Sequence, residues 1–111
     1  MNWIPLTSEA QLDEIVLNSN NKPQVLFKHS TRCSISSMAK SRLERSEVPN
    51  DADFYLLDLI ANRNISNKIA QNFNVYHESP QILIIKNGEC IYDESHGSID
   101  MAEIKEQVFV N

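Results

Sequence analysis

Apolar residues recur at helical spacing in four stretches of the chain. In each stretch they fall three or four positions apart, so that they share one face of a helix. These faces are Leu12, Ile15 and Val16; Ile35, Met38, Ala39 and Leu43; Ile65, Ile69, Ala70 and Phe73; and Met101, Ile104 and Val108. The first helix should span about 8–18, because Ser8-Glu9-Ala10-Gln11 has the spacing of a capping box. The second should end before Pro49, the third should span about 62–73, and the fourth should be capped by Ser98.

Short apolar runs rich in β-branched and aromatic residues alternate with these helices. They predict strands over Gln24–Lys28, Phe54–Asp58, Gln81–Lys86 and Glu89–Asp93. Asn87-Gly88 between the last two is typical of a tight hairpin turn, so those two strands should pair antiparallel. The order α-β-α-β-α-β-β-α predicts an α/β fold with a mixed four-stranded sheet and helices on both faces.

Length and composition favour one ordinary globular domain, residues 1–111, with 41% hydrophobic and 23% charged residues. No apolar stretch has the length of a membrane span, so we expect no membrane partner. Residues 1–5 lack the layout of a signal peptide, and the two cysteines do not form a secreted disulfide framework. These features predict a cytoplasmic protein.

The net charge of −5 conceals a basic stretch around Cys33. Residues 22–45 contain six basic residues and one acidic residue, a local balance of +5. Such a stretch favours a thiolate and attracts an anionic partner, although Lys40, Arg42 and Arg45 also fit the solvated face of a helix. Nucleic acid is a poor candidate partner, because the overall charge is negative and Phe27 is the only aromatic residue in the stretch.

Cys33 lies between the first predicted strand and the second predicted helix. A thiol at such a junction faces the partial positive charge of the helix N-terminus, which favours the nucleophilic thiolate. The alternative is a small buried thiol with no chemistry. Ser36 occupies the place of the second cysteine of a Cys-x-x-Cys motif, so any chemistry here would be monothiol chemistry.

The remaining cysteine and histidines are better explained by structural roles. Cys90 lies within a predicted strand, where packing is a better explanation than a resolving thiol. His29 and His96 flank predicted elements and fit packing or capping roles, although either could belong to a site. Together with Cys33 these residues lack the paired spacing of zinc ligands, so we expect no metal.

The order of elements, with a cysteine after the first strand and a proline before the hairpin, resembles the thioredoxin fold. That resemblance implies a cis peptide at Ser79-Pro80 facing Cys33, where the backbone of residue 79 would pair with a bound thiol substrate. Within the superfamily, residues 27–36 and 94–99 most resemble the monothiol bacilliredoxins of the bacillithiol system. Members typically show a Thr-x-Cys-Pro-Ile-Ser motif and a later Ser-His pair.

This chain keeps the motif residues Thr31, Cys33, Ile35 and Ser36 and the pair Ser95-His96. Ser34 replaces the proline of the motif, and Gly97 stands where an aromatic residue is common. The resemblance implies that Cys33 removes bacillithiol from mixed disulfides on client proteins. A second bacillithiol or a bacillithiol disulfide reductase system would then regenerate the thiol.

The resemblance also implies roles for residues near Cys33. Ser36 could donate a hydrogen bond to the Cys33 thiolate, the alternative being a serine on the helix surface. Arg32 could stabilise the thiolate and meet a carboxylate of bacillithiol, which carries a malate group. Thr31, Ser79 and Pro80 would complete the substrate site.

Two other functions stay open at this point. A thioredoxin-fold binding module without turnover is favoured by the missing proline at Ser34. An iron–sulfur carrier is less favoured, because the Cys-Gly-Phe-Ser signature of monothiol glutaredoxins is absent. The fold alone does not decide between these functions.

Overall fold

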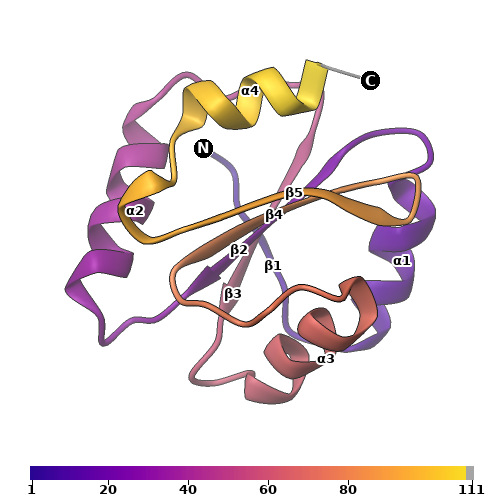
Figure 1. Cartoon of the computed structure of the whole chain (residues 1–111), viewed down its shortest axis with the longest axis horizontal. Coiled ribbons are helices and arrows are strands. Elements are labelled where there is room, and N and C mark those ends of the chain that lie inside the picture. Colours follow the sequence, from indigo (N-terminus) through magenta and orange to yellow (C-terminus); the bar gives the residue numbers. More distant parts are fainter. Residues whose placement is uncertain (110–111) are drawn as a thin grey trace.

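The computed structural model of the chain describes residues 1–109 (Figure 1). Its elements follow one another in the order β1 (Ile4–Pro5), α1 (Ala10–Asn18), β2 (Gln24–His29), α2 (Ser34–Arg45), β3 (Asp53–Asp58), α3 (Arg63–Phe73), β4 (Gln81–Lys86), β5 (Glu89–Ser95), the short 3-10 helix η1 (His96–Ser98) and α4 (Met101–Phe109). None of the helices in this part of the chain is long and apolar enough to cross a membrane.

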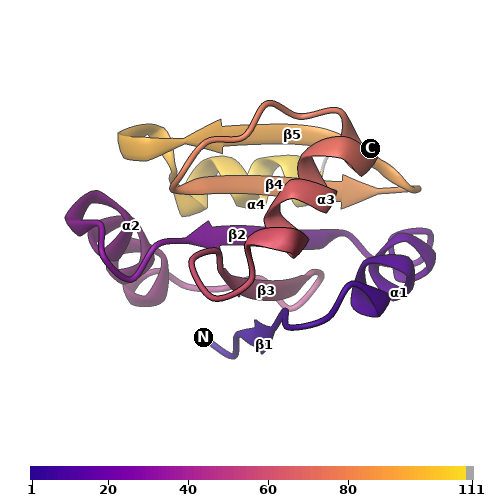
Figure 2. The same cartoon turned by 90° about the horizontal axis from the view of Figure 1, so that it is seen from below.

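The sheet is mixed, with the strand order β1-β3-β2-β4-β5 (Figure 2). The strands β1, β3 and β2 run parallel, whereas β4 is antiparallel to both β2 and β5. The predicted mixed α/β sheet is confirmed, but it has five strands rather than four. The missed strand, β1, has only two residues and one of them is Pro5, so it carries no alternating pattern and occupies an edge.

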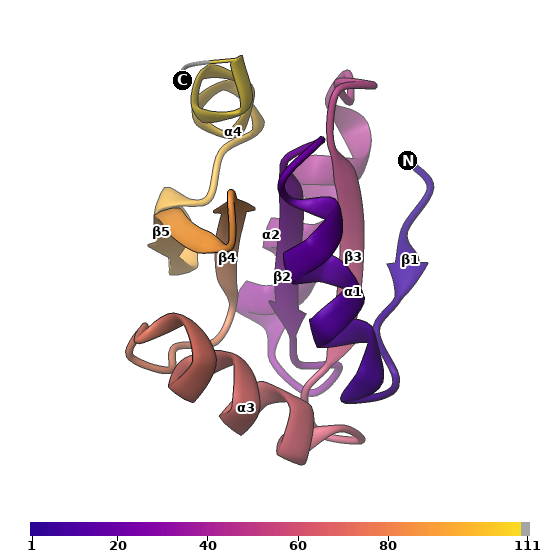
Figure 3. The same cartoon turned by 90° about the vertical axis from the view of Figure 1, so that its right-hand side faces the viewer.

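Helices cover both faces of the sheet, as predicted (Figure 3). Two apolar cores result, one on each side of the strands. On one side α1 and α3 bury Leu12, Ile15, Ile65, Ile69 and Phe73 against Leu26, Leu57 and Leu83. On the other side α2 and α4 bury Ala39, Leu43, Met101, Ile104 and Val108 against Val25, Phe27 and Ile82.

The buried face of α2 differs from the predicted one. Ile35 and Met38 are 51% and 63% exposed, and the buried positions are Ser36, Ala39 and Leu43. The helix is rotated from the predicted face because the Ser36 hydroxyl has polar partners inside the protein, described below. A spacing argument that counts only apolar residues cannot find such a face.

Helix starts also differ from the prediction. Ser98 lies in η1, and α4 is capped instead by Asp100, whose Oδ1 accepts the Ala102 N–H at 3.0 Å. At α1 only half of the capping box forms, because Gln11 Oε1 accepts the Ser8 N–H at 3.0 Å while the Ser8 hydroxyl does not cap the helix. The helix therefore begins at Ala10.

The β4–β5 hairpin turns through the predicted Asn87-Gly88. Both residues have positive φ, 52° and 79°, as a type I′ turn requires. The turn is also tied to the end of α1, since Ser19 Oγ accepts the Gly88 N–H at 2.8 Å and the Ser19 carbonyl accepts the Asn87 N–H at 2.9 Å.

The register of the sheet brings three connecting segments together at one end of its strands. Lys28 of β2 lies opposite Gln81 of β4, and Gln81 lies opposite Ser95 of β5. The chain after β2, the chain before β4 and the chain after β5 therefore leave the sheet at the same end, on the left in Figures 1 and 2. We call this the thiol end, because Cys33 follows β2 there.

Candidate thiol site

Cys33 caps the N-terminus of α2. Its backbone is extended, with φ −112° and ψ 120°, its N–H donates to the Ser30 carbonyl at 3.2 Å, and its carbonyl accepts the Ser37 N–H at 3.0 Å. The side chain is a free, half-buried thiol, and no acidic residue lies in the first turn of the helix. The thiol thus lies where the partial positive charge of the helix is concentrated, as the sequence predicted.

Ser36 is fully buried one turn into α2, so it is not a surface serine. Its Oγ lies 2.6 Å from His29 Nδ1 and accepts the Ser30 N–H at 3.0 Å. Within residues 1–109 no hydrogen bond joins this hydroxyl to Cys33 Sγ. Ser36 therefore fixes the turn that leads to Cys33, and a bond from Ser36 to the thiolate stays a prediction.

His29 lies on the same face of the sheet as α2 and is buried. Its ring stacks on Phe27 with centroids 5.8 Å apart, and Phe27 in turn stacks on Trp3 at 5.6 Å. Burial lowers the pKa of His29, and the nearby Lys40 charge adds to this effect. A neutral ring can accept the Ser36 hydroxyl proton at Nδ1, so His29 has the packing role that the sequence favoured.

Ser79-Pro80 is a cis peptide, as the family resemblance implied. Pro80 is buried directly before β4, and its carbonyl accepts the His96 N–H at 3.1 Å. The Ser79 hydroxyl is buried without a hydrogen-bond partner within the described residues. The cis peptide, η1 and the start of α2 thus lie together at the thiol end.

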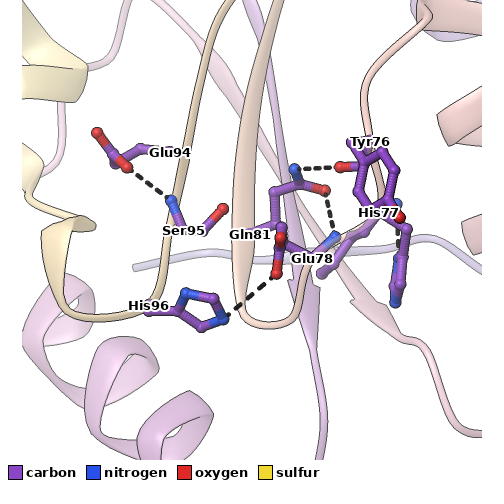
Figure 4. Close-up of polar contacts among 8 residues, drawn as sticks. Tyr76, His77, Glu78, Gln81, Glu94, Ser95 and His96 are labelled. Carbon is purple, nitrogen blue, oxygen red and sulfur yellow. Dashed lines mark hydrogen bonds and ion pairs between the residues drawn. The ribbon is translucent and has the colours of Figure 1, made fainter.

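A polar cluster holds the chain that precedes this peptide (Figure 4). Gln81 Nε2 donates to the Tyr76 carbonyl at 3.0 Å, and Gln81 Oε1 accepts the Glu78 N–H at 3.4 Å. The Glu78 carboxylate lies 3.5 Å from His96 Nε2, so one side-chain pair joins the chain before β4 to the chain after β5. His96 has a positive φ of 57°, unusual for a residue other than glycine.

The basic stretch 22–45 does not surround Cys33 as its sequence suggested. Most of its cations have partners elsewhere: Lys22 with Asp53 at 3.0 Å, Lys40 with Glu44 at 2.8 Å, and Arg42 with the Ile99 carbonyl at 2.9 Å. Arg32, by contrast, directly precedes Cys33 in the chain, is exposed and has no ion-pair partner in the described part of the chain. The cation next to Cys33 is thus Arg32, and Thr31 before it is exposed as well.

Cys90 has the environment of a structural residue. It packs against the α1/α3 core, and its thiol donates to the Tyr92 carbonyl at 3.3 Å. Burial raises the pKa of the Cys90 thiol, which disfavours the thiolate. In the sheet Cys90 pairs with Ile85, beside the hairpin turn and away from the thiol end.

Sequence reasoning missed Lys28, which is fully buried and lies on the opposite face of the sheet from His29. The available signal was a charged residue inside an otherwise apolar strand. Among the described residues, no group of three or more His, Cys, Asp or Glu side chains could hold a metal ion.

The fold, with a cysteine at a helix N-cap and a cis-proline at the same end of the sheet, defines a protein of the thioredoxin-like class. A solved structure described as a candidate oxidoreductase with a thioredoxin fold is 33% identical, with a TM-score of 0.78 over 93% of this chain and 90% of that one. Thioredoxins from Trypanosoma brucei brucei and Malassezia sympodialis have the same fold at 18% and 17% identity, with TM-scores of 0.76 and 0.70. Each comparison covers 96% of this chain and 88% of the thioredoxin.

The family model for monothiol bacilliredoxin BrxC matches residues 4–104, nearly the whole chain. The chain belongs to this family.

Proposed function

We propose that the protein is a monothiol thiol–disulfide oxidoreductase that removes bacillithiol from mixed disulfides on client proteins. The observation that carries this proposal is the free, half-buried Cys33 at the N-cap of α2, in a chain of the bacilliredoxin family. Ser36 stands where a dithiol enzyme has its second cysteine, so exchange must begin and end on one sulfur.

In the first step the Cys33 thiolate attacks the bacillithiol sulfur of the mixed disulfide. A new disulfide forms between Cys33 and bacillithiol, the client disulfide breaks, and the client sulfur leaves as a thiolate that takes a proton from water. In the second step the thiolate of a free bacillithiol attacks the bound bacillithiol sulfur. Cys33 returns to a thiolate, and the oxidised bacillithiol is left for a disulfide reductase system.

The surrounding residues support this chemistry by position. Arg32, the residue before Cys33, is exposed, and its guanidinium is proposed to bind a carboxylate of the malate group. Thr31 and the backbone of Ser79 are proposed to contact the bound disulfide from the two adjoining segments. Ser36 is proposed to act indirectly, by fixing the Ser30 N–H and His29 in the segment that leads to Cys33.

Both cysteines are free thiols, which fits a reducing compartment, and we propose the cytoplasm. The partners in this proposal are bacillithiolated client proteins and the reductase system that recycles bacillithiol.

The test is mass spectrometry of the protein after exposure to oxidised bacillithiol and, separately, to oxidised glutathione. We expect one bacillithiol adduct on Cys33, formed faster than the glutathione adduct, and no adduct on Cys90. A faster glutathione adduct would overturn the assignment to bacillithiol. An adduct on Cys90 alone would overturn the assignment to Cys33.

The exposed Ser34, in place of the family's proline, favours a second candidate, a binding module without turnover. The two are separated by catalytic turnover. An oxidoreductase releases many equivalents of bacillithiol from a mixed-disulfide client when free bacillithiol is supplied, whereas a binding module releases at most one.

A further inference from the structure

Lys28 is a fully buried lysine, 0% exposed, on the central strand β2. Its Nζ donates to the Ser66 carbonyl of α3 at 3.2 Å and lies 3.2 Å from His77 Nδ1. Within the described residues no carboxylate pairs with it. Burying an ammonium group away from acidic partners is costly, and an apolar residue would fill the same space without that cost.

What an apolar residue could not supply is a directional link to His77. His77 lies in the chain between α3 and β4, three positions before Pro80, and its Nδ1 is also 3.3 Å from Ser66 Oγ. Both Tyr76 and His77 are exposed, so apolar burial does little to hold this part of the chain.

Polar bonds replace that burial. Lys28 holds His77 by its side chain, and it lies opposite Gln81 in the sheet. Gln81 in turn holds the Tyr76 carbonyl and the Glu78 N–H (Figure 4). The chain 76–79 is therefore fixed to the sheet from the side opposite α2 and Cys33.

We propose that Lys28 is a positioning residue for the exchange reaction. Acting through His77, it holds residues 76–79 so that the backbone of Ser79 is presented to the disulfide bound at Cys33. This inference rests on the proposed function, and it deepens it by adding a residue that touches neither sulfur. Lys28 thus sets how well the mixed disulfide is bound and leaves the intrinsic reactivity of the thiol unchanged.

The decisive variant is Lys28→Met, because methionine is unbranched, fits irregular apolar space and removes the donor. The matched control is Lys22→Met, which removes a lysine paired with Asp53 at the opposite end of β2. Three quantities are measured on each protein: amide hydrogen exchange of residues 76–79, KM and kcat for a bacillithiolated client, and the rate of Cys33 alkylation by iodoacetamide.

For Lys28→Met we expect amide exchange of 76–79 to rise about tenfold, because the segment opens locally more often. The KM should rise about fivefold with kcat changed less than about twofold, because binding is lost and chemistry is not. Alkylation should be unchanged, since iodoacetamide does not need Ser79. Lys22→Met should leave all three quantities as in the parent protein.

Unchanged amide exchange and unchanged KM in Lys28→Met would overturn the proposal, and so would a loss confined to kcat. If Lys28→Met does not fold, His77→Ala tests the same link from an exposed position, and an unchanged KM there overturns the proposal equally. If the parent protein shows no exchange with a bacillithiolated client, the proposed function fails. The amide-exchange comparison then still decides whether Lys28 holds residues 76–79.

Discussion

The two ends of the sheet bury polar residues for different purposes. Among residues 1–109, seven polar residues are buried, and Lys28, His29, Ser36, Ser66 and Gln81 lie at the thiol end. At the opposite end Ser19 locks the hairpin turn, and Gln24 bonds to Asp53. Polar burial near the turn secures a local structure. At the thiol end it holds together three segments that are distant in sequence.

The two cysteines follow the same division. Cys33 lies at the thiol end on a helix N-cap, whereas Cys90 lies near the hairpin turn, bonded to a carbonyl and packed on the core. Variants at the thiol end should therefore change exchange, whether or not they change stability, and variants near the turn should change stability alone.

The largest effect is expected from Cys33→Ser. Exchange with a bacillithiolated client should be lost entirely, because a serine hydroxyl is not a nucleophile toward disulfides. Cys90→Ser should keep exchange within about twofold of the parent, because burial disfavours the Cys90 thiolate. The measurement is bacillithiol release followed by mass spectrometry. Substantial release of bacillithiol by Cys33→Ser would contradict the assignment of exchange to the thiol end.

Ser36→Ala and Ser19→Ala form the next pair. Each removes a buried hydroxyl that accepts a backbone N–H, so each should lower the free energy of unfolding by about 1–3 kcal/mol. Only Ser36→Ala should also slow exchange, since Ser30 and His29 lose the partner that fixes the turn before Cys33. Denaturant unfolding and client turnover measure the two effects. Equal turnover in both variants would contradict the role of Ser36.

Lys28→Met should raise stability in a pH-dependent manner. Burial lowers the pKa of Lys28 from 10.5 to about 8, so between these values the unfolded chain binds more protons than the folded one. The parent protein therefore gains stability relative to the variant as the pH rises from 8 toward 10.5. At pH 7 the burial penalty is fully present, about 3 kcal/mol for a pKa lowered to this extent. The variant also loses the Lys28 bonds to Ser66 and His77, so it should be more stable by about 1–2 kcal/mol.

Urea unfolding of both proteins from pH 7 to pH 10 measures this difference. A constant difference across the range would show that the Lys28 ammonium is not destabilised by burial.

The smallest effect is expected from Arg32→Ala. Loss of an exposed cation beside Cys33 should slow exchange with bacillithiol about two- to fivefold at low ionic strength, and less at high salt because exposed charges are screened. Arg45→Ala, at the far end of α2, should have no effect at either salt concentration. Identical exchange rates for Arg32→Ala and the parent at both salt concentrations would show that Arg32 does not contribute to the thiol site.

The fold could be predicted from the sequence because its main signals are local. Helical spacing, β-rich runs and Asn87-Gly88 each report on neighbouring residues, and the helices and hairpin occur where they indicate. The strand β1 was not predicted, because it has only two residues and is defined by its pairing with β3. The capping position of Cys33 was also predictable, since it depends on a single junction.

The rest of the site depends on tertiary register. Ser36 is buried because His29 and the Ser30 N–H lie beside it, and nothing in the spacing of α2 reveals those partners. Lys28 meets His77 only because β2 and α3 pack together, since the two residues are 49 positions apart in the chain. Long-range polar contacts of this kind leave no periodic trace in the chain.

The aromatic column on the α2 face gives the protein an optical reporter. Trp3 is the only tryptophan in the chain, and its ring is stacked on Phe27, which is stacked on His29. Indole emission therefore comes from a single place, two rings away from the hydroxyl that fixes the turn before Cys33. Changes that move this turn should alter the emission of Trp3, whereas changes confined to the Lys28 side of the sheet should leave that emission unchanged.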